Sequence, residues 1–123
     1  MLSYLTNYLL ALVVIPLLDT PWLLYLSSTG LKSLVDVQGG RPIQMNIVAG
    51  VPVYFALAYL LLEQRTVYHA TLTGIAVYAV YEFTNLALFK DYSLAFALSD
   101  TLWGGVLFAL SFLVLQEINV RWK

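Results

Sequence analysis

The sequence contains no cysteine, a single histidine and few charged residues. The absence of cysteine excludes disulfides, thiolate nucleophiles and cysteine-ligated iron–sulfur clusters, and it leaves the redox compartment undetermined. Because His69 is the only histidine, metal binding would depend almost wholly on carboxylates. The Glu-x-x-His pair of di-iron bundles and a histidine pair for haem are both missing. We therefore expect no cofactor and no bound metal.

Charge is scarce as well as balanced, with six Lys and Arg against seven Asp and Glu and a net charge of -1. Nucleic-acid-binding proteins carry a basic patch or stripe, so no nucleic-acid partner is expected. The sequence also lacks a Ser, His and Asp set at plausible spacing and a glycine-rich phosphate loop. No catalytic residue is predicted.

Hydrophobic residues make up 61% of the 123 residues and charged residues only 11%. A soluble domain has roughly half and a quarter, respectively, and could not bury this much apolar surface at this size. The first apolar stretch has no Lys or Arg before Lys32, so it lacks the basic region of a signal peptide, and we expect it to be retained. The composition indicates a multi-pass integral membrane protein in a bilayer of unidentified type.

Four windows of about 20 mostly apolar residues are long enough to span a bilayer. The predicted spans are 4–26, 42–62, 67–89 and 92–116, with a longer loop at 27–41. The short turns between the later windows favour antiparallel neighbours. We therefore predict one all-α domain over 1–123, a four-helix transmembrane bundle with up-down-up-down topology and both ends on one side. Lys and Arg are equally divided between the two sides, so the orientation stays open.

Three acids, Asp19, Glu82 and Asp100, lie several residues inside these apolar windows. Counted from the side of the long loop, all three lie roughly 10–12 Å below the same face of the membrane. An ionisable group at that depth is costly and by default indicates a functional site that faces protein. Residues three or four positions away share a helix face with each acid. The candidate ligand-binding residues are Asp19, Trp22, Tyr78, Glu82, Asn85, Asp100 and Trp103.

The stretches at Asp19 and Asp100 share the pattern Asp-Thr-x-Trp on helices that we expect to run in opposite directions. An internal repeat and a chance match in a leucine-rich chain both stay open. Gly104 and Gly105 follow the second motif and would let a neighbouring helix approach closely. For Tyr4, Tyr8, Tyr92 and Trp122 we expect positions in the aromatic belts at the membrane surfaces.

These motifs together resemble a family of small predicted membrane proteins, domain of unknown function 2177. The matching residues are Asp19-x-x-Trp22-Leu23, Tyr78-x-x-Tyr81-Glu82-x-Thr84-Asn85-Leu86-Ala87 with Lys90, and Asp100-x-x-Trp103-Gly104. The family usually has Asp at this position. Glu82 keeps the negative charge of that residue on a longer side chain. The resemblance implies the bundle and the site positions, and it supplies no activity.

Three roles for the acids stay open. They could be neutral or hydrogen-bonded groups that hold the helices together, with Thr84, Asn85, Thr101 and the Trp indoles as partners. They could bind a cation or proton, or they could line a pocket for a polar ligand or lipid headgroup. Burial and neighbouring like charge favour the protonated form of a carboxyl group, so we expect at least one acid to be neutral. Lys32, Arg41 or Lys90 could reach down to pair with one of them.

The small extramembrane portions favour a non-enzymatic structural or accessory subunit that associates with itself or with a larger membrane complex. The alternative is a transport or binding protein that uses the carboxylate cluster for a proton, a cation or a polar ligand. An intramembrane enzyme with Glu82 as a base has the least support.

Overall fold

The computed structural model describes residues 3–25, 39–40 and 46–121. Within these ranges the protein is all-helical and contains no strand, as the sequence predicts. The helices are α1 (Tyr4–Tyr25), α3 (Ile47–Leu62), α4 (Val67–Leu88) and α5 (Leu94–Arg121). Most of the predicted loop at 27–41, with Lys32 and Arg41, lies outside the described residues, and so does Trp122.

Local capping sets several helix ends. The Asn46 side chain accepts a hydrogen bond from the Ala49 amide at 3.2 Å, and α3 begins at the next residue. Thr66 caps α4 in the same way through the His69 amide. At the other end of the chain, α5 continues past the expected end at residue 116. An ion pair one helical turn long, between Glu117 and Arg121 at 2.7 Å, supports the added turn.

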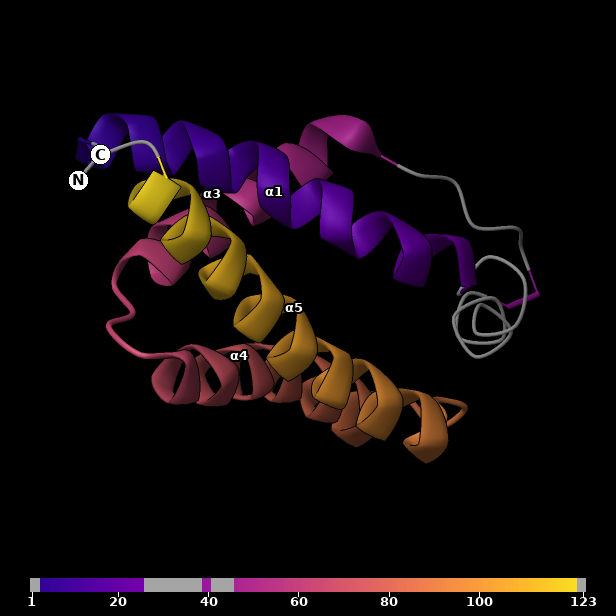
Figure 1. Ribbon diagram of the computed structural model, residues 1–123. Coiled ribbons are helices and arrows are strands. Elements are labelled where there is room, and N and C mark those ends of the chain that lie inside the picture. Colours follow the sequence, from indigo (N-terminus) through magenta and orange to yellow (C-terminus); the bar gives the residue numbers. More distant parts are fainter. Residues whose placement is uncertain (1–2, 26–38, 41–45, 122–123) are drawn as a thin grey trace.

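The helices pack as two pairs, α1 with α3 and α4 with α5, and the contact between α1 and α5 joins the pairs. α4 and α5 lie alongside each other as an antiparallel pair, and α1 packs against both α3 and α5 (Figure 1). The start of α1 meets the end of α5, where the Asn119 side chain donates to the Asn7 side chain at 2.8 Å. The short connection between α3 and α4 lies at this same end of the molecule (Figure 1).

Three glycines let α4 and α5 approach closely. A Cβ added at Gly104 would lie 2.6 Å from the Gly74 carbonyl oxygen, and one at Gly105 would lie 2.6 Å from a side-chain carbon of Ile75. Real Cβ atoms do not come this close, so the backbones touch only because side chains are missing. The same glycine contact lets the Tyr78 ring lie against α5 at Gly104.

The described surface is unusually apolar, and several polar and charged residues are buried among apolar ones. Large apolar side chains are exposed on every helix, and on α5 they recur about every four residues at Leu98, Leu102, Val106 and Leu110. The buried polar and charged residues are Asp19, Glu82, Asp100, Thr101 and Ser111. By length and composition α1 and α5 could each cross a membrane, whereas α3 is apolar but has only 16 residues.

The glycine contact predicts a difference between two Gly→Ala substitutions. Gly104→Ala should lower the free energy of unfolding by about 1–3 kcal/mol, because the methyl group would overpack the helix pair. Gly50→Ala in α3 is the control, since no described atom lies within 4 Å of its added Cβ. It should leave stability unchanged or raise it by up to about 1 kcal/mol through helix propensity. Reversible unfolding in mixed micelles measures both, and equal effects would contradict the close-contact account.

Candidate functional site

The two Asp-x-x-Trp motifs bind each other across α1 and α5. The indole N–H of Trp22 donates to the Asp100 carboxylate at 2.8 Å, and the indole N–H of Trp103 donates to the Asp19 carboxylate at 2.8 Å. The two indoles stack between these bonds with ring centroids 5.4 Å apart and planes 12° apart. Each tryptophan therefore donates a hydrogen bond to the aspartate of the opposite helix, so the two motifs form a reciprocal pair of bonds.

A tyrosine from α3 completes the environment of Asp19. The Tyr54 hydroxyl donates to the second carboxylate oxygen at 2.7 Å, so both oxygens of Asp19 accept a hydrogen bond. Asp19 is 6% exposed. A buried carboxylate is tolerated when its oxygens are hydrogen-bonded, and donors from α3 and α5 thus fix α1 between them.

Glu82 on α4 is held from the connection between α4 and α5. The Tyr92 hydroxyl donates to one Glu82 oxygen at 2.6 Å, and the Asn85 amide donates to the same hydroxyl at 3.5 Å. Burial first, and then the bond to Glu82, raises the pKa of Tyr92 above its ordinary value. The phenol therefore keeps its proton and acts as the donor. Tyr92 is 6% exposed, so its side chain packs inside the protein.

The three acids converge on one place. Asp19, Glu82 and Asp100 are buried and line the same cavity, and the Tyr78 side chain lines it as well. Like charges gathered in one place repel, so this place favours a group of opposite charge.

No basic group in the described ranges neutralises this cluster. The ion pair in the described part of the chain joins Glu117 to Arg121, near the end of α5 and far from the acids. Lys90, one of the basic residues expected to reach an acid, is exposed and makes no such contact. Thr101 was expected as a partner of the acids, but its buried hydroxyl has no hydrogen-bond partner there.

A cavity of about 200 Å³ opens beside the acids. All three acids line it together with five aromatic rings and one leucine. The lining residues are Asp19, Trp22, Leu23, Tyr78, Tyr81, Glu82, Tyr92, Phe96 and Asp100. Within the described ranges no set of three His, Cys, Asp or Glu side chains has the geometry to hold a metal ion. The lining instead combines carboxyl groups with aromatic rings, two kinds of group that attract an organic cation.

The structure brings the seven predicted site residues together. Five of them line the cavity, Trp103 stands behind Trp22, and Asn85 supports the cavity through Tyr92. Sequence reasoning missed Tyr54, which lies in a charge-free helix with no acid near it in sequence. It also missed Phe96, although Phe96 lies four residues before Asp100 on the same helix face.

Comparison with known families agrees with the motifs. The family model described as predicted membrane protein (DUF2177) matches residues 4–115. The chain therefore belongs to this family of predicted membrane proteins, whose function is unknown. No curated protein and no solved structure matches the chain.

The contact between Tyr54 and Asp19 predicts a difference between two Tyr→Phe substitutions in α3. Tyr54→Phe should lower the free energy of unfolding by about 1–3 kcal/mol, because a buried Asp19 oxygen loses its donor. Tyr59→Phe is the control, since Tyr59 is 53% exposed and has no hydrogen bond to a described residue. It should change stability by less than about 0.5 kcal/mol.

The pairing itself is tested by adding Asp19→Asn to each variant. Tyr54→Phe should cost less in the Asp19→Asn background than in the wild type, whereas Tyr59→Phe should cost the same in both. Strictly additive costs for Tyr54→Phe and Asp19→Asn would show that the two side chains do not interact.

Proposed function

We propose that this chain is a multi-pass membrane protein whose four helices cross the bilayer as an up-down-up-down bundle. Two observations support this. Exposed apolar side chains cover all four helices, including α3 and α4, and surfaces of that extent require lipid or protein cover. The connection at residues 63–66 is too short to let α4 follow α3 in the same direction. The membrane-spanning interpretation also accounts for the inward-facing acids.

Within this bundle, we propose that the cavity binds a small organic cation such as a protonated amine. The observation that carries the proposal is a cavity lined by three buried carboxyl groups with no described basic residue to balance them. Structural acids in a membrane are usually paired with a cation or with backbone. Here one oxygen of Glu82 and one oxygen of Asp100 each accept a hydrogen bond from an aromatic donor. The second oxygen of each carboxyl group can therefore accept a hydrogen bond from a bound ligand.

The lining favours an amine over a metal ion or an anion. A space of about 200 Å³ is larger than a bare ion and suits a compact molecule. Tyr78, Tyr81 and Phe96 also line the cavity, and an aromatic ring attracts a cation held over its face by about 0.5–1 kcal/mol at exposed sites. An ammonium group would donate to the oxygens of Glu82 and Asp100 that receive no bond from an aromatic donor. The same site would serve a transport protein if the cation can leave toward the other side.

A structural or accessory subunit of a membrane assembly is the second candidate. It is favoured by the short connections at residues 63–66 and 89–93, which leave no room there for a domain outside the membrane. In this role the acids serve only to hold the helices together, and partner proteins cover the apolar faces. Recovery of a stable monomer from mild detergent would count against this candidate.

Ligand-induced stabilisation tests the binding proposal. A panel of small amines should raise the melting temperature of the purified chain in detergent at pH 8. The rise should shrink as the pH falls to 5, because protonated carboxyl groups no longer attract a cation. Inorganic cations of equal concentration should have a smaller effect. Glu82→Gln and Asp100→Asn should each abolish the stabilisation, and Glu82→Gln should not lower the melting temperature without ligand.

Asp91→Asn provides the matched control, since Asp91 is exposed in the connection before α5. It should respond to amines as the wild type does. If no amine stabilises the wild type and both amide variants melt like it, the acids are only hydrogen-bonding groups and the accessory role gains support. A response that survives in Glu82→Gln would place the bound amine elsewhere.

A further inference from the structure

The hydrogen-bond donors that line the cavity beside the acids differ in whether they are already used. The Trp22 indole N–H donates to Asp100, and the Tyr92 hydroxyl donates to Glu82. Tyr78 also lines the cavity, but its hydroxyl makes no hydrogen bond within the described part of the chain. A phenol keeps its proton at neutral pH, so Tyr78 holds a donor hydrogen that the protein does not use.

The position of the Tyr78 ring is set by the backbone of α5. A Cβ added at Gly104 would lie 2.6 Å from a ring carbon of Tyr78, so the ring occupies space that only a glycine leaves. Tyr78 also lies one helical turn before Glu82 on α4. Residues so spaced share a helix face, with Cβ atoms about 5–6 Å apart. Tyr78 and Glu82 therefore line the cavity as neighbours on one face of α4.

A second tyrosine of α4, Tyr81, also lines the cavity without a hydrogen bond to a described residue. Tyr81 is 59% exposed and lies at the edge of the lining. The Tyr78 side chain is half-buried and packs against α5 at Gly104. Tyr78 is therefore the better enclosed of the two unused donors.

The acids of the cavity need donors, whereas Tyr78 needs an acceptor. One oxygen of Glu82 and one of Asp100 receive no bond from an aromatic donor. An ammonium group carries three donors and no acceptor, so it can satisfy these oxygens but not the Tyr78 hydroxyl. A hydroxyl group on the same molecule can accept a hydrogen bond. A ligand that carries both groups would satisfy the acids and Tyr78 together.

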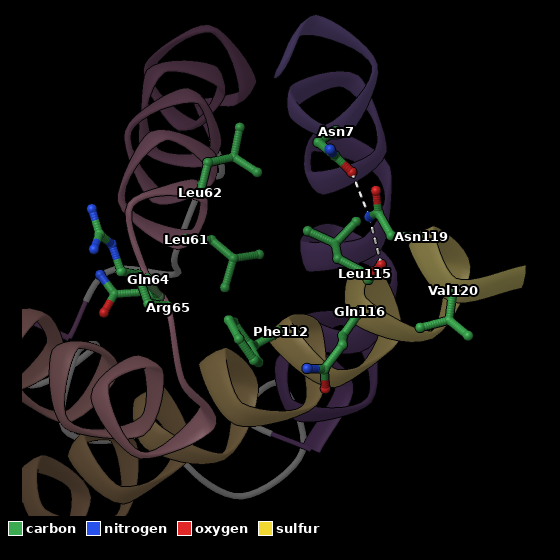
Figure 2. A pocket seen from close by; sticks show the side chains of 10 residues that line it. All are labelled: Asn7, Leu61, Leu62, Gln64, Arg65, Phe112, Leu115, Gln116, Asn119 and Val120. Atoms are coloured by element: carbon green, nitrogen blue, oxygen red, sulfur yellow. Dashed lines mark hydrogen bonds between the residues drawn. The ribbon is translucent and has the colours of Figure 1, made fainter. Parts of the chain in front are cut away.

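The larger cleft of the molecule offers no such match. It has a volume of about 500 Å³ and lies between α3 and α5 at the other end of the helices (Figure 2). No Asp or Glu lines it, so an ammonium group would find no carboxylate there. The amides of Asn119 and Gln64 on its lining already bond to the protein. The cavity beside the acids is thus the place where an amine finds acceptors.

We propose that the ligand of the cavity beside the acids is a short amino alcohol, and that Tyr78 selects it by donating to its hydroxyl oxygen. Two carbons between nitrogen and oxygen suit the site, because Glu82 and Tyr78 are neighbours on one helix face. A space of about 200 Å³ holds a molecule of this size. This inference rests on the proposed amine binding and adds which kind of amine is preferred.

The test compares ethanolamine with propylamine, two amines of nearly equal size that differ by a hydroxyl in place of a methyl group. Each is titrated at pH 8 into the purified chain in detergent, and the half-saturating concentration is taken from the rise in melting temperature. Ethanolamine should half-saturate the wild type at a concentration about three- to tenfold lower than propylamine. This is the gain expected for one neutral hydrogen bond.

Tyr78→Phe removes the donor and keeps the ring. It should raise the half-saturating concentration of ethanolamine to that of propylamine and leave the propylamine value unchanged. The melting temperature without ligand should stay close to that of the wild type, because no hydrogen bond to a described residue is lost. Tyr59→Phe, at an exposed position on α3 outside the lining, is the matched control and should keep the preference for ethanolamine.

The possible failures are distinguishable. Equal responses of the wild type to the two amines would overturn the role of Tyr78 and leave amine binding intact. A preference for ethanolamine that survives in Tyr78→Phe would show that another group recognises the ligand hydroxyl. Loss of both responses in Tyr78→Phe would show that Tyr78 shapes the site without selecting the ligand. A wild type that responds to neither amine would overturn the proposed function and this inference together.

Discussion

The reciprocal bonds between two tryptophans and two aspartates are the contact on which the rest of the structure depends. A carboxyl group inside an apolar bundle is costly unless donors surround it, and here each indole supplies a donor to the opposite helix. Because the bonds cross between α1 and α5, satisfying the acids also fixes how these helices lie against each other. The stacked indoles of Trp22 and Trp103 close the space between them. The same contacts therefore hold the helices together and keep the acids in place.

A second close contact joins α4 and α5. Gly74 and Gly104 touch through their backbones, and Glu82 on α4 and Asp100 on α5 line the same cavity. A wider spacing of the two helices would move these acids apart. The Tyr92 hydroxyl then holds Glu82 from the connection between the helices. The two helices are thus joined by backbone contact at the glycines and, through the connection between them, by the bond from Tyr92 to Glu82.

The two cavities differ in their linings. The cavity near the connection between α4 and α5, for which we propose a cation, is lined by three acids and five aromatic residues. The larger cleft at the other end is lined mainly by leucine and amide side chains. Asp19 accepts a hydrogen bond at both carboxylate oxygens, whereas Glu82 and Asp100 each accept one from an aromatic donor.

The sequence by itself determined the helical class, the membrane family and the residues of the acid cluster, because long apolar runs form helices and an acid inside such a run must face protein. The sequence did not determine which side chain donates a hydrogen bond to which acid. Trp22 shares a helix face with Asp19, and Trp103 shares one with Asp100, but each tryptophan donates to the aspartate of the other helix. Tyr54 and Tyr92 donate hydrogen bonds to Asp19 and Glu82 only because tertiary packing brings them together. Their separation from these acids along the sequence does not indicate the contact. Hydrogen-bond partners and cavities depend on how the helices cross. The spacing of apolar and polar residues along one helix does not determine that crossing.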